Sequence, residues 1–278
     1  MDGPSVPTTE SPAGAWQPLT FGGVAAFAQA PLSRLLLVEF LAALAAAASV
    51  VAFVGMAWAP AIQKAISQLP DGGEIRNGQL QWQGPGRLSL VETRFVALGV
   101  DLAESGELAP VADVQCLLGP TKAKVTWLFG VFSVAYPSRW IIPVNRTDLD
   151  PWWGAWKPAI LAGTGVITFI ALFLIWAVLA FVYGWAVRLL AVVLGRQTTA
   201  QGCRRLAAAA LMPGSLWLSI ALVGYGMGRL ELVGFLLAAA IHFVIGWIYL
   251  AFAPIWLPRK SSSASASENP FQKKSSPD

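Results

Sequence analysis

Two ionisable residues stand inside long apolar stretches of this 278-residue chain and are the first candidates for chemistry. Glu39 is the only charged residue between Leu35 and Trp58, and His242 lies near the middle of the stretch from Leu232 to Leu257. An ionisable group is costly in apolar surroundings, so its presence there often marks a proton path or a ligand contact. We therefore take Glu39 and His242 as candidate polar sites for proton relay, coupling or ligand contact.

Each of these residues also has a structural interpretation, which the sequence favours. Glu39 lies about one helical turn inside its stretch, where a basic side chain could neutralise it. Three basic residues beside the neighbouring apolar stretches could form that ion pair: Arg188, Arg204 and Arg205. His242 is the only histidine and has no zinc-ligand partners at helical spacing, so we expect a neutral imidazole hydrogen-bonded across the helices.

The other reactive residue types give weak signals for catalysis. Cys116 and Cys203 are the only cysteines and fall on opposite sides of the expected membrane, so we expect no disulfide and no metal cluster. Asp148 and Asp150 have the D-x-D form with which some sugar-nucleotide transferases hold a divalent ion, but no nucleotide-binding pattern surrounds them. The chain also lacks a nucleophile elbow, a phosphate loop and a zinc-protease helix, so we expect no enzyme and no cofactor.

The composition indicates which elements must position these residues. Hydrophobic residues make up 56% of the chain and charged residues 12%, against about 25% charged residues in an ordinary soluble domain. This deficit excludes a disordered chain or an ordinary cytosolic enzyme and predicts a multi-pass membrane protein in the lipid bilayer. The net charge of +4 is spread over several segments, so nucleic acid is not an expected partner.

Four stretches are long enough to cross a bilayer about 30 Å thick at about 1.5 Å per helical residue. They run from Leu35 to Trp58, from Ala159 to Tyr183, from Leu206 to Met227 and from Leu232 to Leu257. Basic residues gather between the second and third stretches and after the fourth, which marks those segments as cytoplasmic. Both termini are therefore predicted to be cytoplasmic, and residues 61–157 extracytoplasmic.

Residues 61–157 are well charged yet neutral overall, as a soluble domain would be. Ile62 to Leu69 has the pattern of a short amphipathic helix. Asn77-Gly78 then indicates a hairpin, because a type I′ turn needs positive φ at both central residues. Apolar residues alternate with polar ones along several runs from Leu88 to Tyr136. We expect five to seven short strands in a small antiparallel sheet or sandwich.

Two further motifs point to packing and anchoring. Gly224 and Gly228 form a GxxxG pair, which lets helices approach closely, either within the chain or between two copies in a homodimer. Trp152, Trp153 and Trp156 precede the second stretch and fit an aromatic belt at the outer membrane surface. A sugar-stacking platform is the weaker alternative for these three tryptophans.

The predicted fold is an α-helical integral membrane protein with four transmembrane helices and an inserted small antiparallel β-rich extracytoplasmic domain. Its five segments are a disordered cytoplasmic N-terminus with a short interfacial helix (1–34), transmembrane helix 1 (35–60), the β-rich domain (61–157), a three-helix bundle (158–257) and a disordered cytoplasmic tail (258–278).

The entry into the β-rich domain has a recognisable pattern. Leu69-Pro70 followed by Ile75, Asn77-Gly78 and Leu80 resembles the LP…I-x-N-G-x-L entry of an uncharacterised family of bacterial polytopic membrane proteins. Some members of that family are labelled as linked to maltodextrin utilisation. Val100-Asp101 would match a later hydrophobic-Asp step of the family, although Leu102 stands where the family often has threonine. The resemblance implies a bacterial inner-membrane location and carries over no catalytic residue.

These features favour a non-enzymatic accessory, sensing or assembly factor of the bacterial inner (plasma) membrane. It would bind a protein partner of the envelope through residues 61–157. The alternative is a small transporter, or a subunit of a transport system, that uses Glu39 and His242. An envelope enzyme using Asp148 and Asp150 ranks third.

Overall fold

The computed structural model of the chain describes residues 17–106 and 112–259. Most of the two predicted disordered termini lies outside these residues. The described chain divides into two units. The first comprises the residues up to Glu39, Ile175–Gly214 and the residues from Val244, and the second comprises Phe40–Leu174 and Ser215–Phe243.

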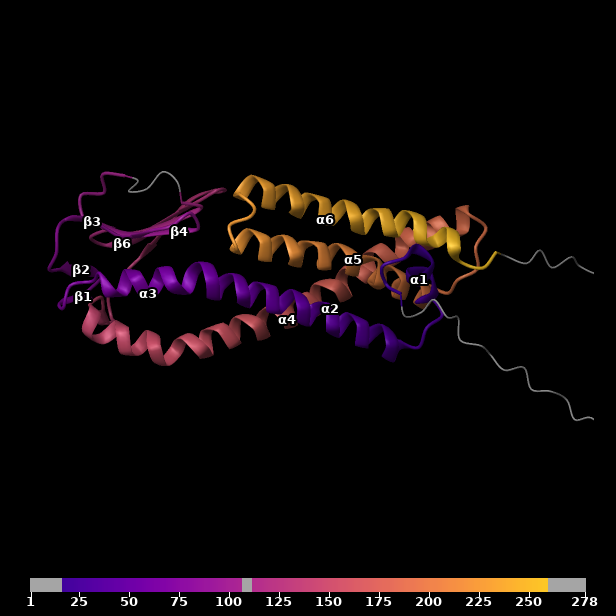
Figure 1. The fold of residues 1–278 in the computed structure, drawn as a ribbon, viewed down its shortest axis with the longest axis horizontal. Coiled ribbons are helices and arrows are strands. Elements are labelled where there is room, and N and C mark those ends of the chain that lie inside the picture. The colour runs from indigo at the N-terminus through magenta and orange to yellow at the C-terminus, as the bar shows by residue number, and fades with distance from the viewer. Residues whose placement is uncertain (1–16, 107–111, 260–278) are drawn as a thin grey trace, which may run out of the picture. The chain divides into compact units, whose positions relative to one another are not determined.

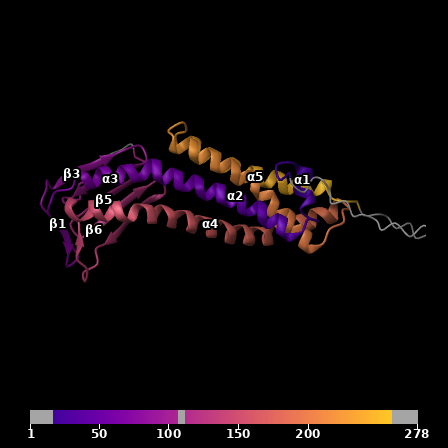
Figure 2. The same cartoon turned by 60° about the horizontal axis from the view of Figure 1, so that its bottom comes forward.

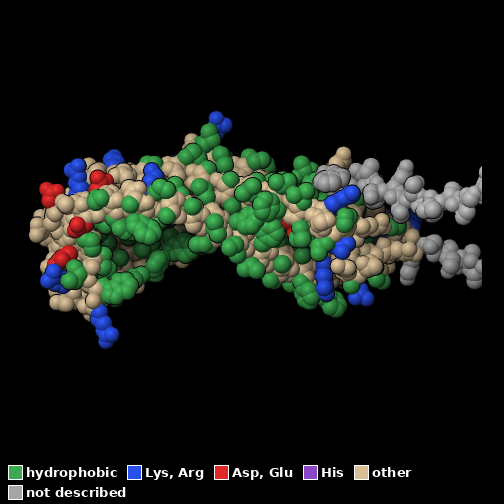
Figure 3. Space-filling model, turned by 90° about the horizontal axis from the view of Figure 1, so that it is seen from below, with side chains coloured by type: hydrophobic (Ala, Val, Ile, Leu, Met, Phe, Trp, Pro, Cys, Tyr) green, Lys and Arg blue, Asp and Glu red, His purple; other side chains and the backbone are tan. Residues whose placement is uncertain are grey.

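Four helical segments of the described chain are long and apolar enough to cross a membrane, which confirms the four predicted stretches at the level of helix length and composition. The first is built from α2 (Leu32–Phe53), a π-turn (Val54–Trp58) and α3 (Ala59–Ser67). The others are α4 (Arg146–Val193), α5 (Ala200–Gly226) and α6 (Leu232–Phe252), the last continued by a 3-10 turn (Ala253–Trp256) (Figure 1). In the view of Figure 3, hydrophobic side chains cover much of the helical surface.

The first helical segment runs on past the predicted end of the membrane stretch. Pro60 has no N–H to donate to the preceding turn, and the π-turn Val54–Trp58 lies just before it. The predicted amphipathic helix from Ile62 is thus the last part of the same helical rod. Its apolar face, with Ala61 and Ala65, packs into the core of the β domain.

The β domain holds two sheets, and the strands fall close to the predicted runs. The smaller sheet has the order β2-β1-β8, with β1 (Gly73–Arg76), β2 (Gln79–Trp82) and β8 (Ile142–Pro143). The hairpin between β1 and β2 turns at Asn77 and Gly78, whose φ angles of 53° and 75° are both positive, as a type I′ turn requires.

The larger sheet has the order β3-β4-β5-β6-β7. Its strands are β3 (Arg87–Glu92), β4 (Val96–Asp101), β5 (Val114–Leu118), β6 (Lys122–Trp127) and β7 (Gly130–Ala135). Figure 2 shows α3 running along this sheet. The core lies between α3 and the sheets and contains Leu69, Ile75, Leu80 and Val100.

One pairing departs from the predicted antiparallel arrangement, because β4 and β5 are parallel. Tight hairpins join antiparallel strands, whereas a parallel pair needs a connection of about a dozen residues or more. β4 ends at Asp101 and β5 begins at Val114, so the twelve residues between the two strands are enough for such a connection. The prediction of a purely antiparallel sheet was therefore wrong at this pair.

In the first unit, the predicted short N-terminal helix is present as α1 (Phe21–Ala26). Its apolar side packs against protein, since Val24 and the following Phe27 are fully buried. Phe21 lies 4.8 Å from the ring of Tyr249, measured between centroids. This segment therefore packs its apolar side against α6, whereas an interfacial helix would place that side on lipid.

Candidate functional site

A polar junction joins the β domain to the end of α5 and the start of α6 in the second unit. The hydroxyl of Tyr225 donates a hydrogen bond to the carboxylate of Asp113, just before β5. The guanidinium of Arg94, just before β4, donates to the backbone carbonyl of Leu230 in the loop between α5 and α6. Both strand starts are thus tied to the same helix end.

Aromatic rings surround these hydrogen bonds. Tyr225 stacks on Phe53 and Phe235, with centroid distances of 5.5 and 4.9 Å. Phe95 meets Tyr225 edge-on at 5.1 Å. The Arg94 guanidinium carbon lies 4.8 Å from the Phe95 ring centroid, a cation–π geometry. Buried rings combined with charged hydrogen bonds make this a specific attachment rather than a loose contact.

The larger sheet of the β domain has a free edge at β7. β7 ends the larger sheet, and among the described residues no strand pairs with its outer side. All six residues of β7 are exposed. Phe132 and Val134 are 51% and 54% exposed although they are large and apolar. An exposed apolar edge strand offers unpaired backbone groups together with side chains that favour burial, which is the arrangement that strand addition by a partner uses.

The apolar face of the sheet continues from the core to this edge. In register, Leu98 of β4 pairs with Cys116, Cys116 with Val125, and Val125 with Phe132. Beneath the inner end of this row lies an apolar hollow of about 160 Å³. Burial raises the pKa of the Cys116 thiol in that row, so Cys116 acts as an apolar residue rather than as a nucleophile.

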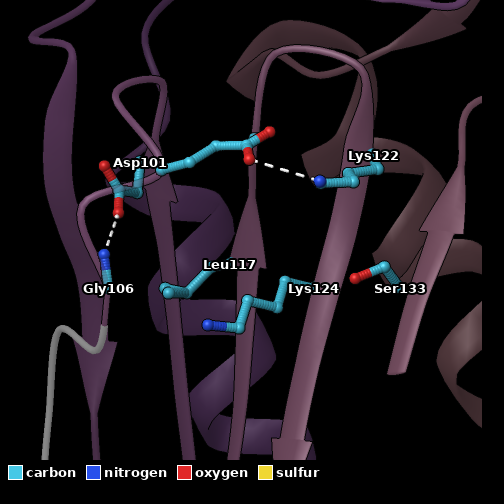
Figure 4. A pocket seen from close by; sticks show the side chains of 8 residues that line it. Asp101, Gly106, Leu117, Lys122, Lys124 and Ser133 are labelled. Carbon is cyan, nitrogen blue, oxygen red and sulfur yellow. Dashed lines mark hydrogen bonds and ion pairs between the residues drawn. The ribbon is translucent and has the colours of Figure 1, made fainter. Parts of the chain in front are cut away.

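A polar pocket of about 210 Å³ lies at the end of the same sheet opposite the junction, where β4 and β5 end and β6 begins. Figure 4 shows Asp101 pointing toward the backbone of Gly106 and Lys122 reaching the neighbouring carboxylate. That ion pair joins Lys122 to Glu104 at 3.2 Å. The Asp101 carboxylate accepts from Ser105 and from the Gly106 N–H, so these groups close a loop.

Tyr136, just after β7, lies at the same end of the sheet as this pocket. Its hydroxyl donates to the carbonyl of Gly119 at 3.1 Å. Burial, with a smaller contribution from the Cys116 charge, raises the pKa of Tyr136 to about 12. The hydroxyl is therefore a neutral structural donor at physiological pH.

Glu39 is buried, with 9% of its surface exposed. Glu39 takes part in neither of the ion pairs Arg76–Glu74 and Lys122–Glu104, and its predicted pairing with Arg188, Arg204 or Arg205 is not formed among the described residues. Arg205 instead donates to the carbonyl of Ala30 at 2.7 Å, and Arg204 lies over the ring of Phe181. Arg205 therefore contacts a backbone carbonyl and Arg204 an aromatic ring, rather than the Glu39 carboxylate.

His242 lies on α6 in the second unit, whereas Glu39 belongs to the first. Its Nδ1 atom is 3.1 Å from the carbonyl oxygen of Ala239, one turn earlier on the same helix. The expected hydrogen bond across the helices is therefore absent from the described contacts. A carbonyl three residues back lies on the same face of the helix, which makes it the nearest acceptor.

The GxxxG segment ends the helix and also contacts a neighbouring helix, and different glycines serve the two purposes. Gly228 lies beyond the end of α5 with φ +77°, and the hydrogen bonds from Gly228 N to Tyr225 O and from Arg229 N to Gly224 O form a Schellman cap. Gly226 is the glycine of close approach, because a Cβ there would lie 3.1 Å from the Phe53 ring. Pairing with a second copy through Gly224 stays a prediction.

The tryptophan segment is helical and forms the start of α4. Trp153 is buried against Ile66 and Ala59 of α3, whereas Trp152 and Trp156 are exposed. The anchoring role thus stays a prediction for Trp152 and Trp156, while Trp153 has a packing role.

Both carboxylates of the neighbouring D-x-D motif accept hydrogen bonds from side chains of the protein. Asn145 caps the helix, accepting from the Asp148 N–H and donating to its carboxylate, both at 2.9 Å. Gln63 donates to Asp150 at 2.7 Å. No group of three or more His, Cys, Asp or Glu side chains suited to a metal ion occurs within residues 17–106 and 112–259.

Sequence reasoning missed the junction residues Arg94, Asp113 and Tyr225. They lie far apart in the chain, and the only one inside a recognised motif is Tyr225, which lies between the two glycines of the GxxxG pair. The one available signal was a tyrosine at the end of an apolar stretch. In comparisons with known proteins, no family model, no curated protein and no solved structure matched the chain.

Proposed function

We propose that this protein is a non-enzymatic accessory or assembly factor of the bacterial inner membrane that binds an envelope protein through β7. The observation that carries the proposal is the free edge strand, exposed along its whole length and apolar at Phe132 and Val134. A partner would add an extended segment to this edge through backbone hydrogen bonds. Its apolar side chains would cover both residues.

The junction supports this role because it holds the sheet that contains β7 in place. Arg94, Asp113 and Tyr225 attach the sheet to the ends of α5 and α6, so β7 is presented in a defined position relative to those helix ends. A preorganised surface loses less entropy when a partner binds.

The membrane orientation is part of the same proposal. Four apolar helices are present, and Lys and Arg gather in the segment between α4 and α5 and after α6. We therefore place these segments and both termini in the cytoplasm, and residues 61–157 outside. The bacterial location rests on the resemblance of the Leu69–Leu80 segment to the family described above.

Site-specific photo-crosslinking in intact cells tests the proposal. A benzoylphenylalanine at position 132 or 134 is expected to give one dominant crosslinked product of defined mass. The matched control is position 89, because Ser89 is exposed on β3 at the opposite edge of the same sheet. Val134→Lys, combined with the crosslinker at 132, should remove the product, because a charge opposes burial of the edge.

Three results would contradict the proposal. Equal products at positions 89 and 132 would show a surface without preference for β7. A product that persists in Val134→Lys would show that edge burial is not needed. A product of twice the chain's own mass would make a second copy the occupant, giving a homodimer instead of a different envelope protein.

The transporter alternative has one observation in its favour, the burial of Glu39 without an ion pair among the described residues. Its test is proton flux in proteoliposomes loaded with a pH-sensitive dye. Transport coupled through Glu39 would be lost in Glu39→Gln, while an accessory protein would give the same leak with and without the substitution. His242→Ala is the parallel variant for the second residue of that alternative.

A further inference from the structure

The turn between β6 and β7 carries three consecutive large apolar side chains, Trp127, Leu128 and Phe129. All three are exposed, Phe129 to 75%. Residues 125–138 contain no charged residue, although the surrounding β domain is rich in charge. Aromatic side chains gathered on a turn in water are unfavourable, so a surface that covers them is expected.

The strand register places this turn at the end of the sheet that meets the helices. Trp127 pairs with Val114, the first residue of β5, and paired residues lie about 5 Å apart. Asp113, next to Val114, accepts the hydrogen bond of Tyr225 near the end of α5. Trp127 is therefore level with the junction, and Leu128 and Phe129 extend past it. Figure 1 shows the sheet ending beside the end of α5 and the start of α6.

We propose that the turn Trp127–Leu128–Phe129 enters the lipid leaflet at whose surface α5 ends and α6 begins. A helix that crosses the bilayer leaves it near its last apolar residues, so the level of Tyr225 marks the membrane surface. Tryptophan and phenylalanine side chains at that level are favourable in the region between headgroups and acyl chains. The bilayer would thus bury the three apolar side chains that the protein itself leaves exposed.

This contact is separate from the partner surface of the proposed function. β7 runs away from the turn, and Val134, four residues after Gly130, lies about 13 Å farther out at about 3.3 Å per residue. The turn would reach lipid while the far part of β7 stays in water. The inference rests on the helices crossing the bilayer, but not on partner binding, so either can fail alone.

The test uses the full chain in nanodiscs of phosphatidylcholine and phosphatidylglycerol. Cys116 and Cys203 are replaced by alanine, and a single cysteine at Phe129 carries an environment-sensitive NBD dye. The matched control is Thr121→Cys, because Thr121 is exposed at the other end of β6. We expect a blue-shifted emission at 129 that doxyl-labelled lipids quench, and at 121 an emission quenched only by aqueous iodide.

A second measurement avoids the cysteine substitutions. Benzoylphenylalanine at position 129 of the otherwise unchanged chain should form an adduct whose added mass equals one phospholipid. The same group at 121 should form none. Iodide quenching at 129 equal to that at 121 would overturn the proposal. So would a blue shift at 129 that doxyl lipids leave unchanged, or crosslinks at 129 to protein alone.

Discussion

The Tyr225 hydroxyl donates its hydrogen bond to Asp113 across a sequence separation of 112 residues, joining a helix end to the start of a strand. We expect Tyr225→Phe to lower the local stability of this junction by about 1 to 3 kcal/mol, because a partly buried hydrogen bond to a carboxylate is lost. Amide hydrogen exchange should then accelerate at the starts of β4 and β5 and stay unchanged in β1 and β2. Unchanged exchange at Val96 and Val114 would show that the hydrogen bond contributes nothing.

Arg94 is expected to act together with Tyr225, since its guanidinium lies over the Tyr225 ring and binds the Leu230 carbonyl. Arg94→Lys keeps the charge but loses the planar stacking group. The double variant Arg94→Lys with Tyr225→Phe should therefore deviate from additivity by about 0.5 kcal/mol or more in a double-mutant cycle. Strict additivity would mean that the two residues stabilise the junction independently.

Two glycines on α5 should respond differently to the same substitution. Gly226→Ala places a Cβ 3.1 Å from the Phe53 ring, whereas Gly224→Ala makes an ordinary contact with Leu230 at 3.5 Å. We expect the Gly226 variant to be less stable than the Gly224 variant by about 1 kcal/mol, because overpacking forces neighbours to move. Thermal unfolding in mild detergent compares them. Equal melting temperatures would contradict close packing at Gly226.

Tyr136 should make the β domain sensitive to alkaline pH. The unfolded side chain ionises near pH 10, while in the folded chain burial, followed by the Cys116 charge, raises the pKa of Tyr136 to about 12. The folded state thus binds the phenolic proton more tightly. The stability contribution is complete below pH 10 and is lost as the pH rises toward 12.

The measurement is a tyrosinate absorbance titration of the chain and of Tyr136→Phe. The difference between the two curves isolates one tyrosine, and its midpoint should lie near 12 rather than 10. Tyr183→Phe provides the control, because its difference curve reports a second single tyrosine in the same chain. A Tyr136 midpoint at 10 would show that the hydroxyl is solvated in the folded chain.

Glu39→Gln should leave thermal stability unchanged or raise it. The carboxyl is buried and forms no ion pair among the described residues, and an uncompensated buried charge is costly. The isosteric amide cannot ionise and preserves the shape of the side chain. A clear drop in melting temperature would indicate that Glu39 has a stabilising partner in the membrane-embedded protein.

The sequence by itself determined the elements whose signal is local. Stretches of apolar residues long enough to span a bilayer predicted the four helices, and alternation with turn residues located most strands. Asn77-Gly78 even predicted its turn type, because two successive positive φ angles suit few other dipeptides. Each of these signals resides in neighbouring residues, so no knowledge of distant contacts was needed.

Only the tertiary structure decided which residues meet. The parallel pairing of β4 with β5, the cap formed by Gly228 and the junction of Tyr225 with Asp113 depend on partners distant in the chain or on where a helix stops. An apolar alternation also looks the same on a buried strand and on an exposed one. β7 was therefore predicted as a strand like the others, and its free edge became visible only when the strand order placed it last in the sheet.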